Sequence, residues 1–174
     1  LELRMLAHYM NDKEYTEEIL NGDIHTANQM AAGLQSRDSA KTFIYAFLYG
    51  AGDAKIGDVV GGTAKDGAKL KAEFLANTPA LRVLREQVSR GSAKGWIRGL
   101  DGRKLWIRSP HLALNTLLQS AGAIVMKQAL TLLEKYANIY NINYKFVLNI
   151  HDEIQSEVDE AQAEQFGQLA VACM

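Results

Sequence analysis

The sequence predicts an α+β fold that is mostly helical and carries a small antiparallel sheet. Apolar residues recur at helical spacing along most of the 174 residues. Two stretches, WIRGLDGRKLWIR and KFVLNIHDEIQSEV, instead favour β-hairpins, because short runs of β-prone residues flank a tight turn. With 48% apolar residues and only two prolines, the chain can bury a sizeable core.

The first part of the chain is predicted to be helical. Residues 1–10 indicate a strand end that runs into a helix, with Leu3, Leu6 and Met10 on one face. Further helices are expected over residues 15–20, 26–32, 37–49, 63–76 and from Pro79 onward.

The second part is predicted to mix hairpins and helices. Strands 96–99 and 105–108 should flank an Asp101-Gly102 turn. A long helix from residue 112 to about residue 137 should follow. The apolar run 146–150 should be a buried strand of the second hairpin, and a last helix should begin at about residue 160.

Charge is segregated along the chain, although the net charge is only −1. Residues 82–108 contain eight basic and two acidic side chains, a net charge of +6, whereas residues 146–174 contain six acids and no Lys or Arg. A basic surface attracts phosphates, and an acidic one collects divalent metal ions. Cys173 is the only cysteine, which excludes an internal disulfide and suits a reducing compartment.

The two ends of the sequence predict an internal fragment of a longer protein. The chain opens on LELRMLAHYM without an initiator methionine, and it closes on QLAVACM without a helix stop signal. No signal peptide and no apolar run of membrane-spanning length is visible.

One predicted helix carries a stripe of cations and phenols. Arg37, Lys41, Tyr45 and Tyr49 are four residues apart, so they share one helix face. Arg binds phosphate in a bidentate manner, Lys acts as a point charge, and Tyr stacks on a sugar or base. The order therefore matches a triphosphate followed by its sugar and base. An amphipathic helix whose cations simply face water is the alternative.

The second hairpin places His151, Asp152 and Glu153 at its tip. Solvated acids favoured by turn geometry are one interpretation. The other is a metal-binding carboxylate on a rigid element, which needs a second carboxylate and a phosphate-binding surface elsewhere.

Four motifs together resemble family A DNA polymerases, the polymerase I group. Arg-x3-Lys-x3-Tyr-x3-Tyr-Gly resembles their nucleotide-binding finger helix, and IHDEIQ resembles their palm motif. LELR resembles the end of a third motif, Asp-x-Ser-x-Leu/Ile-Glu-Leu-Arg, and NTLLQSAGA resembles the Asn-x3-Gln primer-template segment. The motifs keep the family order, and NGDIHTANQMAAGL and LDGRKLWIRSPHLALNTLLQSAGA look most like the replicative polymerases of short-tailed phages.

The resemblance implies mostly helical fingers and part of the antiparallel-sheet palm of a right-hand polymerase. Residues 1–10 would be the end of a palm strand and the following helix, and residues 11–95 the fingers. Residues 96–174 would be the palm portion with the basic hairpin, the long helix and the HDE hairpin.

The resemblance also implies template-directed addition of dNTPs to a primer 3′ end by two-metal phosphoryl transfer. Asp152 matches the metal-ligand Asp of the palm motif and Glu153 a supporting carboxylate, with two Mg²⁺ ions in the intact enzyme. Lys41 matches a candidate proton donor to the leaving pyrophosphate. The family's second metal-binding Asp would stand four residues before Leu1, so the fragment alone is expected to be inactive.

Other residues match the family's nucleotide contacts. Arg37 and Lys41 would hold the triphosphate, with His25 as a further phosphate contact. Glu2 matches the sugar gate that packs against the finger-helix aromatic, here Tyr45, and blocks a 2′-hydroxyl.

The remaining matches concern primer-template DNA. Tyr49 would border the templating base, and His151 would lie near the primer terminus. Asn115 and Gln119, four apart on a helix, would read minor-groove acceptors. The expected duplex and backbone contacts are Arg98, Arg103, Lys104 and Arg108.

The implied partners are primer-template DNA, dNTPs and, in the parent enzyme, a processivity factor, with no membrane. The implied setting is a phage-encoded enzyme acting in the host cytoplasm.

A single-subunit RNA polymerase is an alternative with a similar helix and an HD hairpin, but a ribonucleotide enzyme should carry no sugar gate such as Glu2. A non-catalytic nucleic-acid-binding module, using the basic stripe alone, is another. A metal hydrolase would need a closely spaced His/Asp cluster, which the sequence does not show.

Overall fold

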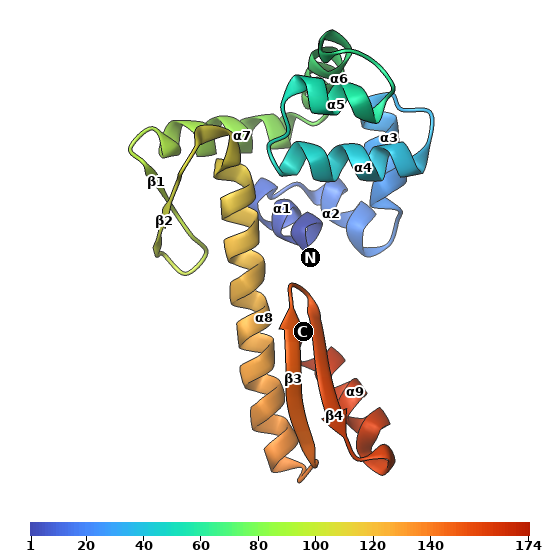
Figure 1. Ribbon diagram of the computed structural model, residues 1–174, viewed down its shortest axis with the longest axis vertical. Coiled ribbons are helices and arrows are strands. Elements are labelled where there is room, and N and C mark those ends of the chain that lie inside the picture. Colours follow the sequence, from blue (N-terminus) through green and yellow to red (C-terminus); the bar gives the residue numbers. More distant parts are fainter. The chain divides into compact units, whose positions relative to one another are not determined.

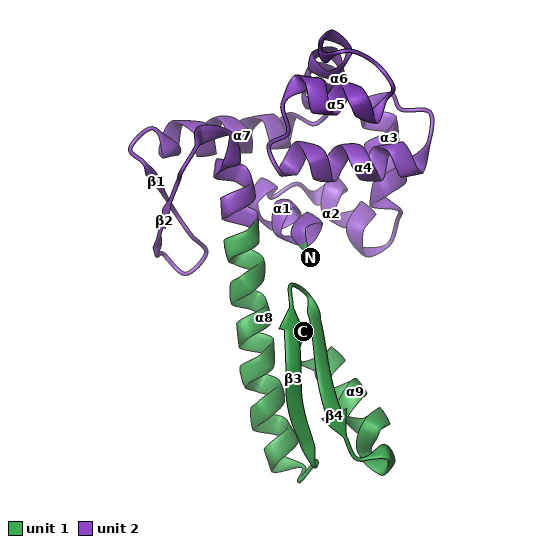
Figure 2. Ribbon diagram, in the orientation of Figure 1, with its two compact units in different colours: residues 1, 119–174 green, residues 2–118 purple.

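The computed structural model describes residues 1–174 and divides into two compact units (Figure 2). Unit 1 comprises Leu1 and Gln119–Met174, and unit 2 comprises Glu2–Leu118. This border falls inside the portion expected to be palm, so the division into fingers and palm stays a prediction. None of the helices combines the length and the apolar character needed to cross a lipid bilayer.

Unit 2 is built mainly from short helices (Figure 1). They are α1 (Glu2–Met10), α2 (Lys13–Leu20), α3 (Ile24–Ala32), α4 (Arg37–Leu48), α5 (Asp53–Val59), α6 (Ala64–Asn77) and α7 (Pro79–Ser92). A hairpin of β1 (Trp96–Arg98) and β2 (Lys104–Trp106), a 3-10 turn η1 (Pro110–Leu112) and the start of α8 (Ala113–Ile139) complete it. The expected strand end at residues 1–10 is absent, since Glu2 already lies in α1 and no strand is present to pair with this segment.

Side-chain caps explain where several of these helices begin. Asp12, Asp23 and Ser36 precede α2, α3 and α4, and each accepts a hydrogen bond from a backbone N–H of the first turn. Thr63 and Asp66 form a capping box at α6. Pro79 occupies the first turn of α7, where its missing N–H costs nothing.

Three phenylalanines are central to the core of unit 2. The rings of Phe43 and Phe74 meet edge to face at 5.1 Å between centroids, and Phe47 lies 5.6 Å from Phe74. Ile44 and Leu48 belong to the same buried cluster. One face of helix α4 is therefore buried in the core of unit 2.

Helices α5 and α6 approach each other through glycine. A Cβ atom on Gly67 would stand 2.0 Å from the Asp53 carbonyl oxygen and 2.6 Å from the Gly57 nitrogen. A Cβ on Gly57 would stand 2.1 Å from the Thr63 carbonyl oxygen. Since backbone atoms occupy these positions, side chains there would force the two helices apart.

Unit 1 contains the rest of α8, the hairpin of β3 (Tyr144–Ile150) and β4 (Glu153–Val158), a 3-10 turn η2 (Glu160–Gln162) and α9 (Ala163–Ala172). Its core joins α8 to α9 through Leu133, Ala137, Ile142 and Phe166. Tyr144, Ile154 and Val158 of the hairpin pack against this cluster.

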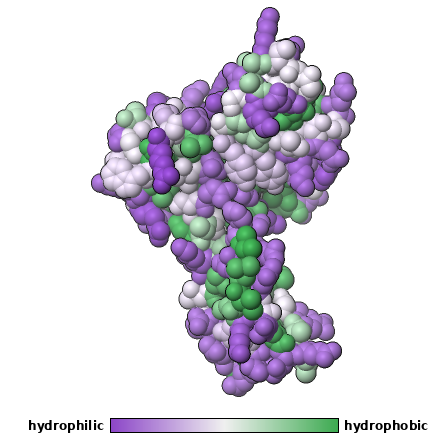
Figure 3. Space-filling view, viewed as in Figure 1, coloured by the Kyte–Doolittle hydropathy of each residue, from purple (hydrophilic) through white to green (hydrophobic).

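The apolar run of β3 is exposed, although the sequence predicts a buried strand. Phe146, Val147, Leu148 and Ile150 are 40–59% exposed, and Figure 3 shows hydrophobic surface in the lower half of the view. The reason is that β3 pairs only with β4, in a two-stranded sheet whose core contacts go through Tyr144 and alternate residues of β4.

We expect Gly67→Ala to lower the free energy of unfolding of unit 2 by about 2–3 kcal/mol, because the new methyl group overlaps backbone atoms that cannot move independently. Gly91→Ala is the matched control. Its Cβ would lie 3.4 Å from a methyl group of Ile97, and alanine is the better helix former, so stability should be unchanged or higher. Urea unfolding of the two variants measures both effects. Equal stability of the two variants would contradict the close approach of α5 and α6.

Candidate functional site

Helix α4 and its C-cap present the predicted stripe on the surface of unit 2. Arg37 and Lys41 are exposed, Tyr45 is half-buried, and Tyr49 is 46% exposed at the C-cap. The rings of Tyr45 and Tyr49 lie 6.3 Å apart between centroids. The structure therefore places two cations and two phenols in sequence along one helix.

Asp23, the N-cap of α3, holds Arg37. The Arg37 Nε donates to Asp23 Oδ2 at 2.6 Å, and Nη2 donates to Oδ1 at 3.1 Å. The guanidinium, together with the Thr26 hydroxyl, holds the pKa of the Asp23 carboxyl well below its usual range. Asp23 is not among the site residues predicted from the sequence, since its position before a helix in NGDIHT indicates only a cap.

His25 lies between this ion pair and the phenols. Its ring centroid is 6.3 Å from that of Tyr45, and its buried Nδ1 has no hydrogen-bond partner. Burial lowers the pKa of the imidazole, and the nearby Arg37 cation lowers it further. Both effects favour the neutral form of His25, whose ring lies near the cations Arg37 and Lys41.

Glu2 joins the same surface from α1. The Tyr49 hydroxyl donates to Glu2 Oε1 at 3.4 Å, a long hydrogen bond between exposed groups. From the sequence, Glu2 is predicted to act with Tyr45, and that pairing stays a prediction. The bond from Tyr49 connects Glu2 with the same stripe of side chains.

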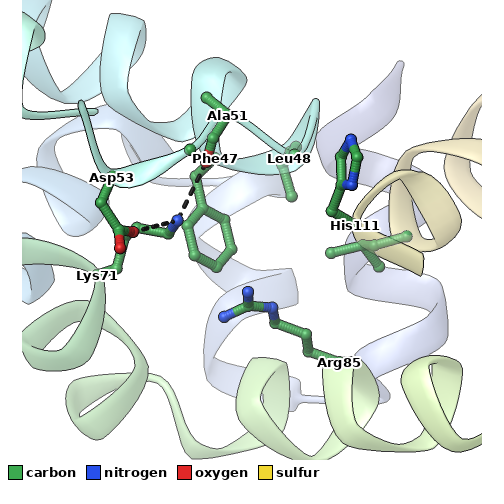
Figure 4. A pocket seen from close by; sticks show the side chains of 10 residues that line it. Phe47, Leu48, Ala51, Asp53, Lys71, Arg85 and His111 are labelled. Carbon is green, nitrogen blue, oxygen red and sulfur yellow. Dashed lines mark hydrogen bonds and ion pairs between the residues drawn. The ribbon is translucent and has the colours of Figure 1, made fainter. Parts of the chain in front are cut away.

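A cavity of about 410 Å³ adjoins the turn between α4 and α5 (Figure 4). The Lys71 ammonium stabilises this turn with two hydrogen bonds: it donates to the Ala51 carbonyl at 3.0 Å and to Asp53 Oδ1 at 2.8 Å. The Arg85 guanidinium lies 5.3 Å from the centre of the Phe47 ring. Lys71 was not predicted from the sequence, and Arg85 was noted only as one of the basic side chains of residues 82–108, because the contacts of both depend on tertiary packing.

The HDE turn belongs to unit 1. Ile150 pairs with Glu153, so His151 and Asp152 form a two-residue loop. His151 has φ of 53°, in the left-handed region where a residue with a side chain costs about 1–3 kcal/mol. Asp152 is 56% exposed, and its Oδ2 lies 3.7 Å from the N-terminal ammonium of Leu1. Glu153 is also exposed, and its Oε1 accepts a hydrogen bond from Gln155 Nε2 at 2.6 Å. Both carboxylates of the turn are thus on the surface, and each has one neighbouring partner.

No group of three or more His, Cys, Asp or Glu side chains in the chain could enclose a metal ion. The exposed carboxylates of Asp152 and Glu153 still fit Mg²⁺, because this ion commonly binds one or two carboxylates together with water and substrate phosphates.

The predicted DNA contacts lie on the β1–β2 hairpin and around the start of α8. Arg98, Lys104 and Arg108 are exposed. Arg103 is bound by its neighbour Asp101, with Nε 2.6 Å from Oδ2, and is therefore less available to phosphate than Arg98. Asn115 and Gln119 are half-buried in α8, on either side of the unit border.

The profile of DNA polymerase family A matches residues 1–174. The chain belongs to this family. The DNA-directed DNA polymerases of Enterobacteria phage T3 and Escherichia phage T7 are 50% and 49% identical to it, each over 179 residues that cover 89% of this chain and 25% of the relative. The DNA-directed DNA polymerase of Escherichia phage Phieco32 is 39% identical over 209 residues, covering all of this chain and 34% of the relative. The chain thus spans about a quarter to a third of the length of these relatives.

A solved structure confirms the fold class. The POL domain of Pol1 from M. smegmatis, in complex with DNA primer-template and dNTP, gives a TM-score of 0.87 over 99% of this chain and 34% of that chain. Its sequence identity is 20%, so the likeness concerns the fold. The resemblance to family A and the α+β class are both confirmed.

We expect Asp23→Asn to lower the melting temperature at pH 7 and to lower it by a smaller amount near pH 3. Asparagine keeps the cap of α3 but removes the charge that pairs with Arg37. Because the folded-state pKa of Asp23 is depressed, the stabilisation is present above the unfolded value of about 4 and is lost as pH falls toward the folded value. Thermal unfolding of wild type and variant at both pH values measures the difference. A gap that stays constant across this range would contradict the assigned charge effect.

Proposed function

We propose that the chain forms the nucleotide-binding surface and part of the catalytic centre of a template-directed DNA polymerase, which adds dNTPs to a primer 3′ end. The observation that carries the proposal is the α4 stripe, where an oriented guanidinium, an ammonium and two phenols follow one another. Membership in family A and relatives named DNA-directed DNA polymerase support it.

The triphosphate would bind at the first turns of α4. Arg37 would bind phosphate oxygens through its fixed guanidinium, and Lys41, one turn later, would add a mobile charge. His25 would accept or donate a hydrogen bond there and would become protonated more readily beside an anion. Lys41 would also donate a proton to the leaving pyrophosphate, which needs neutralisation as the bond breaks.

The acidic turn of unit 1 would hold divalent metal through Asp152, the exposed carboxylate at its tip. Two Mg²⁺ ions would supply charge neutralisation at the reacting oxygens. Glu153, fixed by Gln155, would support the tip, and the β3–β4 pairing would keep Asp152 in a constant orientation.

The remaining sites would contact primer-template DNA. Tyr49 would border the templating base, His151 the primer terminus, and Asn115 with Gln119 the minor groove. Arg108 and the cations of the β1–β2 hairpin would bind phosphates.

In this assignment residues 11–95 serve as fingers and residues 96–174 as palm. The phage relatives favour a phage-encoded enzyme acting in the host cytoplasm. The family match argues against the RNA polymerase and metal hydrolase alternatives.

In the whole enzyme, Asp152→Asn should lower kcat by about a thousandfold or more, since the loss of a metal ligand removes several kcal/mol of transition-state stabilisation. Glu157→Gln, which neutralises another exposed acid of β4, is the control and should stay within about twofold. Single-turnover primer extension measures both variants. A loss of less than about tenfold for Asp152→Asn would mean that another carboxylate binds the metal. The 174-residue chain alone, in which Asp152 is the one proposed metal ligand, should extend no primer.

In the whole enzyme, Glu2→Ala should raise the ratio of kcat/KM for ATP to that for dATP by about tenfold or more, because the carboxylate beside Tyr49 would no longer exclude a 2′-hydroxyl. Tyr49→Phe removes the hydrogen bond but keeps the carboxylate, so the ratio should change less. Glu14→Ala, an exposed acid of α2, is the control. An unchanged ratio in Glu2→Ala would remove Glu2 from sugar selection.

A further inference from the structure

The β1–β2 hairpin has one docked face and one solvent face. Ile97 and Leu105 pair across the strands and pack against the core of unit 2. Because side chains alternate along a strand, the other two pairs, Trp96 with Trp106 and Arg98 with Lys104, share the opposite face. These four residues together with Lys94 are called the hairpin face below.

The hairpin is held firmly despite its short strands. The Gly99 N–H donates to the Arg103 carbonyl at 2.8 Å, and the Ile107 N–H donates to the Gly95 carbonyl at 2.9 Å. On the docked face, Ile97 is buried next to Gly91 of α7. These contacts support the hairpin face from behind. Figure 1 shows the β1–β2 hairpin following the end of α7.

The hairpin face combines aromatic rings with unpaired cations. The Lys94 and Lys104 ammonium groups lie 3.8 Å and 4.8 Å from the centre of the Trp96 ring. Trp106 is 71% exposed, more than any other aromatic side chain on the surface. Lys94, Arg98 and Lys104 take part in no ion pair, and Arg98 stands directly opposite Lys104, an unfavourable arrangement in an isolated sheet.

We propose that the hairpin face binds unpaired bases of single-stranded DNA, with Trp106 as the stacking surface and Lys94, Arg98 and Lys104 as phosphate contacts. An open indole face beside several cations is the combination that single-strand binding sites use. Duplex DNA offers phosphates but no free base faces, so duplex binding would leave Trp106 exposed. An acidic peptide would satisfy the cations but would gain little from a flat exposed ring. The inference rests on the proposed function, because that function supplies DNA as the ligand.

Intrinsic fluorescence tests the proposal directly, since Trp96 and Trp106 are the only two tryptophans and both lie on the hairpin face. The 174-residue chain is titrated with oligothymidylate, with an abasic oligomer of equal length and charge, and with a blunt duplex. Oligothymidylate should quench the fluorescence and bind more tightly than the other two. The assay needs no metal, nucleotide or primer extension, so its failure is distinct from failure of the polymerase proposal.

Three variants separate stacking from charge. Trp106→Ala should weaken oligothymidylate binding by about 5- to 150-fold, the range typical for loss of one stacked base, and Trp106→Phe should restore most of it. Lys104→Gln should reduce the slope of log K against log salt by about 0.7, whereas Lys69→Gln, an exposed cation of α6, should leave it unchanged. Binding by the Trp106→Ala variant is followed by anisotropy of a labelled oligomer.

Two results would overturn the proposal. Equal affinity of wild type and Trp106→Ala, or of the oligothymidylate and the abasic oligomer, would reduce the hairpin face to a charge contact without base stacking. Quenching by an acidic peptide such as oligoglutamate, without quenching by oligothymidylate, would assign the hairpin face to a protein partner.

Discussion

The burial of one face of α4 is the constraint on which the rest of the proposed nucleotide-binding surface depends. Phe43, Ile44 and Phe47 are nearly inaccessible, and burial of each such side chain contributes about 1.5–3 kcal/mol. A rotation of the helix by one residue, about 100°, would move this face out of the core. The apolar face therefore fixes the direction in which Arg37 and Lys41 point, although neither cation contributes to the core.

This dependence explains why the stripe of cations and phenols on α4 was predictable, whereas Asp23, the ion-pair partner of Arg37, was not. The i, i+4 spacing is a local property, so the sequence alone predicts which side chains share a face of α4. The Asp23–Arg37 ion pair joins residues 14 apart and exists only because α3 packs on α4. Any exposed carboxylate of a neighbouring element was an equal candidate from the sequence. The β1–β2 turn was predictable for the same local reason, since Asp101-Gly102 restricts its geometry.

Two departures from prediction have tertiary causes. Helix α5 has seven residues within the glycine-rich segment GAGDAKIGDVVGG, and such a segment has little helical tendency alone. Its helix is stabilised by burial of Ile56 and by the close contact that Gly67 permits with α6. Conversely, the apolar run of β3 has the composition of a buried strand but a single neighbouring strand. Composition predicts which residues can be buried, whereas topology decides which residues are covered.

The Asp23–Arg37 pair at first sight opposes the proposed role of Arg37, because a carboxylate occupies the group that should bind phosphate. A guanidinium has five N–H donors, and Asp23 uses one on Nε and one on Nη2. Three donors remain, on the other side of the planar group. The carboxylate therefore holds the guanidinium in one orientation while leaving donors for an anion.

This fixed orientation would reduce the entropic cost of nucleotide binding. Because the Arg37 side chain is already ordered in the folded protein, less of the binding free energy would be needed to order it. The same carboxylate reduces the positive charge that the anion meets. Asp23 thus reduces the electrostatic attraction of this site but fixes the orientation of the guanidinium, and Lys41, one turn later on α4, adds a second positive charge.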